Sequence, residues 1–430
     1  MKKSLLRAAF VACLPFCAIG VAVVTIPAVA AEKAPTPTIS KSISKFMVDA
    51  KKANDAKDWQ TVIAKCKEAQ QVADLTDYDK YMIARFLGVA YFGINDHASA
   101  KTEFAAVVKN PATPPDDRKY LGLPAMELAA EGNDYASVID LGKIALQDDP
   151  TNSEIIGSLA IAYYNINDFA NAQIYAQKGI DTAAAAGKLA QYGTYQVLAF
   201  SLDKQKKTAD EVKAFELLAR DYGKPDDWKY LLDFSLELLP AGNKSQREIA
   251  ALDIYRLRVI TPATWTASNY AEMADAAQAV RSWGDARQAL EAGLSKGVLT
   301  QAKVGALLNQ VTADARKDEP ALPAAEKLVK GAKEAVNVAE GYYGYGRYAD
   351  AARVAQKAAD LGGPTAGEAK LLLGMCQVRL GDETTAAQTL TGVTGDPSIV
   401  RAAQLWNIYV SRKYGKTPAA PATPAPAAAH

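Results

Sequence analysis

Histidine and cysteine are scarce in this chain of 430 residues. Its two histidines are His97 and His430, the second being the last residue, and two of its four cysteines lie within the first 17 residues. Metal centres and nucleophile–histidine pairs need several such side chains, so the residues for them are missing. The other cysteines, Cys66 and Cys376, are too few and too far apart for a disulfide framework, and we expect each to pack as a small apolar residue.

An excess of basic charge is also lacking, because 49 Lys and Arg are balanced by 48 Asp and Glu. A nearly neutral chain has no electrostatic footprint for nucleic acid. A phosphate loop is missing as well. The glycine-rich stretch 341–346 (GYYGYG) lacks the Lys-Ser/Thr pair of such loops, and no strand-like pattern precedes it. These absences predict a protein that is not an enzyme and that needs no cofactor or metal.

The first 30 residues have the pattern of a secretory signal peptide. Basic residues at positions 2, 3 and 7 precede an apolar run, and residues 28–30 (Ala-Val-Ala) form a small-residue cleavage site. We therefore expect cleavage after Ala30 and a periplasmic mature protein. Two alternatives stay open: an uncleaved membrane anchor, because residues 8–31 carry no charge, and lipidation at Cys17. Any membrane contact would come from this segment alone.

Internal repetition is the strongest pattern in the rest of the chain. A 34-residue window from Tyr81 has small or apolar residues at positions 4, 7, 8 and 11, and again at 20, 24 and 27. Stripes with this 3.6-residue period predict two helices that pack face to face. The pattern returns in windows that start at Lys119, Ser153, Ala267, Ala332 and Gly367. It is weaker over 43–80 and 225–266, and it drifts in phase over 187–224 and 301–331.

This pattern resembles the tetratricopeptide repeat. The residues that carry the resemblance include Leu87, Gly88, Tyr91, Ala100 and Phe104, and in a later window Leu159, Ala160, Tyr163, Ala172 and Ala176. The resemblance implies an all-α fold, an α-solenoid of about ten helix-turn-helix pairs forming a superhelix with a concave groove. We expect a linker over 31–42, the repeat domain over 43–400, a capping helix over 401–416 and a disordered Pro/Ala-rich tail over 417–430.

The resemblance also implies where a partner would bind, because positions 2, 5, 9, 12 and 13 of each first helix line the groove in this family. Transferred by phase, the candidate partner-binding residues are Arg85, Phe92, Ile161, Tyr164, Glu340, Tyr343, Met375 and Arg379. The alternative is that the aromatic residues among them pack between repeats. A clamp for a peptide's carboxylate terminus is not expected, because only Arg85 fits that pattern.

These observations predict a non-enzymatic scaffold of the bacterial cell envelope that binds a protein or peptide in the concave face. The alternative is a periplasmic carrier of a hydrophobic small ligand, such as a lipid or sterol, because a tight superhelix can enclose an apolar cavity.

Overall fold

The computed structural model describes residues 37–240 and 243–412, and every regular element in these ranges is an α-helix. The helices are α1 (Lys41–Asp55), α2 (Trp59–Gln70), α3 (Asp77–Gly93), α4 (His97–Lys109), α5 (Pro115–Glu131), α6 (Tyr135–Asp148), α7 (Ser153–Asn165), α8 (Phe169–Ala185), α9 (Tyr192–Lys204), α10 (Thr208–Asp221), α11 (Pro225–Glu237), α12 (Lys244–Ile260), α13 (Ala267–Ala279), α14 (Trp283–Ser295), α15 (Gln301–Lys327), α16 (Ala332–Gly344), α17 (Tyr348–Leu361), α18 (Ala366–Arg379), α19 (Glu383–Thr391) and α20 (Pro397–Val410). The predicted signal segment, most of the linker and the C-terminal tail lie outside the described residues. Within these ranges no helix is both long and apolar enough to span a bilayer.

One turn recurs between the two helices of eight pairs. The residue at position 15 of the unit has a positive φ at Lys57, Asn95, Asn133, Asn167, Lys206, Arg281, Gly346 and Gly381. The next residue caps the second helix. In five units it is an aspartate that accepts a hydrogen bond from the backbone N–H three residues on. A left-handed residue followed by a cap reverses the chain in few residues, so each pair is an antiparallel hairpin, and the predicted repeat is confirmed.

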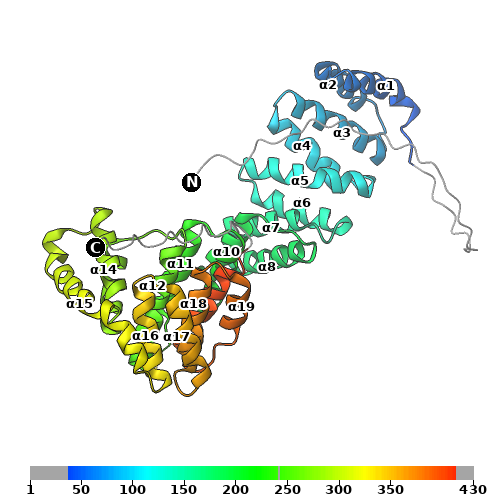
Figure 1. Cartoon of the computed structure of the whole chain (residues 1–430). Helices are drawn as coiled ribbons and strands as arrows, with labels where there is room; N and C mark the ends of the chain where they lie inside the picture. The colour runs from blue at the N-terminus through cyan, green and yellow to red at the C-terminus, as the bar shows by residue number, and fades with distance from the viewer. Residues whose placement is uncertain (1–36, 241–242, 413–430) are drawn as a thin grey trace, which may run out of the picture.

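Helices α1–α10 form an open arm of five stacked pairs (Figure 1). Each helix packs against its neighbours along the chain, and the first helices of adjacent pairs also touch. Small residues allow this approach: a Cβ on Gly88 would lie 2.5 Å from the Phe104 ring. Cys66 lies in the arm and Cys376 in the other half, and both are free and fully buried, as expected.

The phase drift in the sequence has a structural cause. The units of the arm begin at residues 43, 81, 119, 153 and 192, as judged from the left-handed residue at position 15. Their spacings are therefore 38, 38, 34 and 39 residues. The last spacing reflects the longer helix α8 and the loop that follows it, which move the buried positions of α9 five residues beyond the 34-residue phase.

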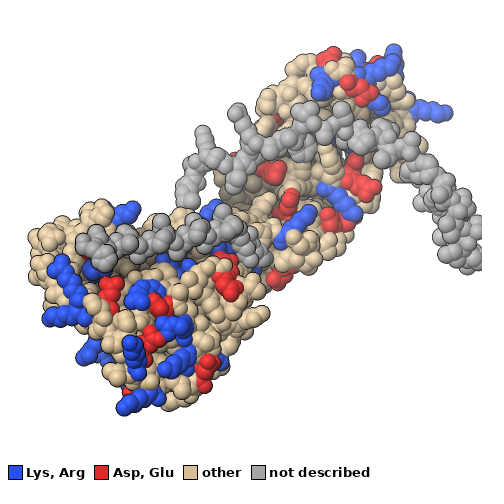
Figure 2. Space-filling view, in the orientation of Figure 1, with Lys and Arg blue, Asp and Glu red and all other residues tan. Residues whose placement is uncertain are grey.

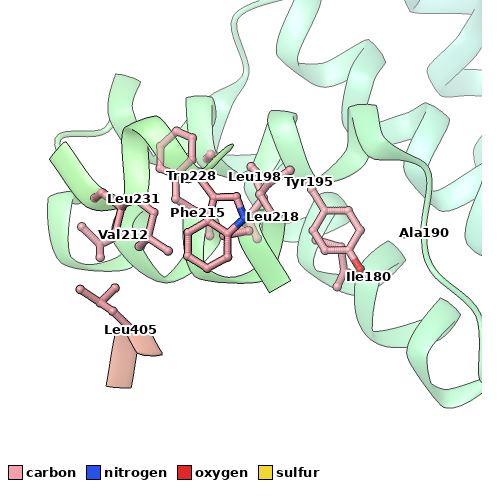
Figure 3. Close-up of a cluster of buried hydrophobic side chains, with 14 of the residues drawn as sticks. Ile180, Ala190, Tyr195, Leu198, Val212, Phe215, Leu218, Trp228, Leu231 and Leu405 are labelled. Atoms are coloured by element: carbon pink, nitrogen blue, oxygen red, sulfur yellow. The ribbon is translucent and has the colours of Figure 1, made fainter. Parts of the chain in front are cut away.

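The C-terminal half, α11–α20, closes on itself (Figure 1). Helix α20 packs on α18 and α19, as a capping helix should, but also returns to α10 and α12. Trp406 Nε1 donates to the Asp253 carbonyl at 2.9 Å, and Arg401 donates to Ser235 Oγ at 2.9 Å. Figure 3 shows Leu405 of α20 beside Val212 at the junction between the two halves. The capping helix runs over Pro397–Val410 and not from 401 onward.

Helix α12 is the central element of this half. Its residues 252–258 are all buried, so nearly two turns are enclosed on every side. It packs mainly against α20 and α13, and less against α11, which precedes it. The expected stack of helix pairs therefore describes the arm, whereas in the C-terminal half α12 and α20 are packed among the other helices.

Two helices stand outside the pairing. Nine helix pairs are present in the described ranges, and α15 and α20 are single. Helix α15 is 27 residues long and contains Pro320 and Pro323. One long helix in place of a pair explains why residues 301–331 look helical without keeping the repeat phase.

Candidate partner-binding surface

The repeat positions determine which residues are neighbours on adjacent first helices of the arm. A Cβ on Gly193, at position 2 of its unit, would lie 3.6 Å from Ile161 Cδ1, at position 9 of the unit before. Glu127, at position 9, is close enough to Glu154, at position 2 of the next unit, for the two charges to interact. Position 9 of one first helix thus adjoins position 2 of the next.

We define the inner strip by six residues at these two positions on α3, α5, α7 and α9. They are Val89, Tyr120, Glu127, Glu154, Ile161 and Phe200. Tyr120 is 46% exposed and Phe200 is 38% exposed, so both rings present apolar surface to solvent. The strip is apolar at both ends and acidic in its middle. Figure 2 shows both acidic and basic atoms over the middle of the arm.

Arg85 was predicted to bind a partner and is already engaged within the arm. Its Nε donates to Asp117 Oδ2 at 2.6 Å, and Tyr81 donates its hydroxyl hydrogen to the same carboxylate. Burial raises the pKa of Tyr81, and the hydrogen bond to Asp117, which lies on the first helix of the next pair, raises it further. The contact holds α3 and α5 in register beside the inner strip.

The three aromatic residues at position 12 share one arrangement. Each packs against the ring at position 17 of its own unit, across the interhelix turn. Phe92 stacks on His97 with centroids 5.6 Å apart, and Tyr164 meets Phe169 edge-on at 5.5 Å. Tyr343 meets Tyr348 edge-on at 5.1 Å. These ring contacts lie within one unit, whereas the alternative considered from sequence was packing between repeats; Phe92 remains 37% exposed and Tyr164 is half-buried.

Two of the predicted residues of the C-terminal half, Glu340 and Tyr343, contact α12. Tyr343 is 4% exposed and Met375 is fully buried. Glu340 Oε2 lies 2.7 Å from Arg256 of α12, and the guanidinium of Arg256 lies 4.4 Å from the Tyr343 ring centroid. Arg379 lies over the ring of Tyr348, with 4.5 Å to its centroid. As the structure stands, a partner could not reach Tyr343 or Met375.

Arg256 is the hub of a buried ionic network. Its guanidinium bonds Asp253 at 2.8 Å and Asp285 at 2.7 Å, besides Glu340, and thereby joins α12, α14 and α16. Burial raises the pKa of Asp253 well above its usual range. Arg256 opposes this rise, and the charges of Glu340 and Asp285 add to it. The Tyr343 hydroxyl beside this network has no hydrogen-bond partner within the described residues. The network is structural, since it is closed to solvent.

Hollows on the surface of the described residues include two between neighbouring helices. One of about 490 Å³ lies between α11 and α13, and the other, of about 260 Å³, lies among α8, α9 and α10. The first is lined by Lys229, Asp233, Leu236, Glu237, Thr266, Ser268, Asn269 and Glu272. Charged side chains line both hollows, so neither is the apolar cavity that a lipid carrier needs.

The exposed side chains of the inner strip offer contact surface. Across residues 37–240 and 243–412, no three His, Cys, Asp or Glu side chains are grouped to hold a metal ion. His97 Nδ1 lies 2.8 Å from Glu131 Oε2 at the surface, and its ring takes the position-17 role filled elsewhere by Trp59 or Tyr135. Sequence reasoning missed Tyr120 and Phe200. Tyr120 could have been found at position 2 of its unit, but the shifted phase concealed Phe200.

Comparison with known proteins gave structural matches only. No family model matches the chain, and no curated protein matches it. Similar solved structures include a MamA RS-1 double mutant, which is 14% identical over 41% of this chain and 93% of its own, with a TM-score of 0.31. A tetratricopeptide repeat protein from Parabacteroides merdae is 11% identical over 79% of this chain and all of its own (TM-score 0.31). The C-terminal part of a TPR repeat-containing protein from Cytophaga hutchinsonii is 16% identical over 76% and 99% (TM-score 0.27).

Proposed function

We propose that this protein is a non-enzymatic scaffold of the bacterial cell envelope that holds a protein or peptide partner along the inner strip of its arm. The observation that carries the proposal is the contrast between the two halves. The inner side of the C-terminal half is filled by α12 and α20, whereas the arm exposes Tyr120 and Phe200 on its inner side. Exposed rings on a rigid repeat supply contact area at little entropic cost.

Location in the envelope rests on the first 30 residues, whose basic start, apolar run and Ala-Val-Ala ending are typical of an export signal. The mature N-terminus, determined by mass spectrometry of the protein from its native cells, should be Ala31. An N-terminus at Met1 in a cytoplasmic fraction would refute export.

Site-specific photocrosslinking tests the binding surface. A photoreactive amino acid in place of Phe200 should capture a discrete partner in native cells. The matched control is the same substitution at Ile174, which is 61% exposed on the second helix α8 and lies off the inner strip. Capture from both positions alike, or from neither, would contradict the proposal.

A further inference from the structure

The inner strip has an acidic centre between apolar ends. Val89 and Tyr120 lie at one end, on α3 and α5, and Ile161 and Phe200 lie at the other, on α7 and α9. Between them, α5 and α7 place two glutamates side by side. The inner strip thus has a definite order: apolar, acidic, apolar.

The two glutamates carry charge that the protein does not neutralise. Among the described residues, no Lys or Arg forms an ion pair with Glu127 or Glu154, whereas the nearby Glu131 has His97. Partial desolvation raises the pKa of Glu127, and the charges of Glu154 and Glu131 raise it further. Like charges held together without a counter-charge destabilise the free protein, and a cation from outside would relieve that repulsion.

We propose that the occupant of the inner strip is a basic, amphipathic segment of a partner protein. Its Lys or Arg side chains would lie over Glu127 and Glu154. Its apolar side chains would pack on Tyr120 toward one end and on Phe200 toward the other. This inference rests on the proposed function and adds the chemistry of the partner.

The length of the segment follows from helix packing. The strip crosses four first helices, and packed helices lie about 8–10 Å apart, so its span is roughly 24–30 Å. An extended chain covers that distance in about nine residues, at about 3.3 Å per residue. A 12-residue peptide is therefore long enough to contact both apolar ends and the acidic centre at once.

Selection from a displayed library of random 12-residue peptides tests the inference, with the full chain immobilised at low ionic strength. Peptides recovered by the unmodified protein should be enriched in Lys and Arg flanked by apolar residues. For a recovered peptide, Glu127→Gln with Glu154→Gln should weaken binding by about five- to tenfold, because two charge contacts are lost. The matched control is Asp140→Asn with Asp181→Asn, which removes the same charge from exposed positions on α6 and α8 and should leave the affinity unchanged.

The possible outcomes separate this inference from the proposed function. If recovered peptides lose binding to the Phe200→Ala variant but show no cationic enrichment, the strip binds a partner and the basic segment is wrong. Enrichment of neutral or acidic peptides that depend on Phe200 would likewise show that the strip binds a partner but that the bound segment is not basic. If no peptide depends on Phe200, both proposals fail. Circular dichroism of each variant should match that of the unmodified chain, because the substituted side chains are exposed or half-exposed.

Discussion

Replacing Arg256 with Met should unfold the C-terminal half at a much lower denaturant concentration. Arg256 is 2% exposed and contacts three carboxylates, those of Asp253, Asp285 and Glu340, at 2.7–2.8 Å. Methionine matches the apolar part of the arginine side chain but leaves these buried groups without their only shared cation. Breaking a buried ion pair from one side costs about 3–5 kcal/mol, because the charge left behind is uncompensated.

Urea unfolding of the full chain at neutral pH, followed by tryptophan fluorescence, measures this loss. Hydrogen exchange of peptides from α12 and α16 assigns it to the C-terminal half. The matched control is Arg316→Met on α15. Arg316 is exposed and has no ion pair within the described residues, so the change should stay within about 0.5 kcal/mol.

A second substitution distinguishes charge from packing. Adding Asp253→Asn to Arg256→Met removes one of the stranded charges and should recover part of the lost stability. If Arg256→Met costs no more than Arg316→Met, or if Asp253→Asn makes the double variant less stable still, the network does not act through buried charge, and this reasoning is refuted.

Further predictions concern the interhelix turns, the contacts between helices, the closure of the C-terminal half and the acidic centre of the inner strip. Lys206 has φ 56°, so Lys206→Gly should stabilise the arm by about 0.5–1 kcal/mol in urea unfolding, because glycine adopts this conformation without strain. A Cβ on Gly284 would clash with a backbone carbonyl of α16, so Gly284→Ala should cost about 1–3 kcal/mol and lower the thermal midpoint. Trp406→Ala should cost about 3–5 kcal/mol and increase hydrogen exchange in α12, while exchange in α3–α7 stays unchanged. The pKa of Glu127 is raised in the fold, so the native state retains this proton to higher pH than the unfolded chain does. Glu127 should therefore contribute more to stability as the pH falls from 7 toward its ordinary pKa of 4.5, and Glu127→Gln should remove that contribution in a series of melting curves.

The sequence by itself determined the helix pairs of this protein. Apolar residues at a period of 3.6 specify which face of each helix is buried, and that information is local. The turn is local too: Asn95, Asn133 and Asn167 tolerate the left-handed conformation, and the aspartate after each caps the next helix. For these reasons the all-α solenoid could be predicted without knowledge of any long-range contact.

The binding surface was predictable only in part. Ile161 was identified from position 9 of the repeat, and its place on the inner strip depends on how α7 and α9 stack. Phe92, Tyr164 and Tyr343 were identified from position 12 of the repeat. The repeat pattern did not indicate that each contacts the ring at position 17, across the interhelix turn. Phe200 stayed hidden because the extra turn of α8 shifts every later residue relative to a 34-residue window.

Only the tertiary structure decided that the C-terminal half closes around α12. The segment Leu-Asp-Ile-Tyr-Arg-Leu-Arg, residues 252–258, carries three charged side chains, and charge usually marks a solvated face. These charges are buried because their partners arrive from α11, α14 and α16. Trp406, which bonds the Asp253 carbonyl, arrives from 153 residues further along the chain. Hydrophobic periodicity carries no information about such partners. Burial of an ionic residue depends on which distant helix supplies the opposite charge, and that is settled only when the chain has folded.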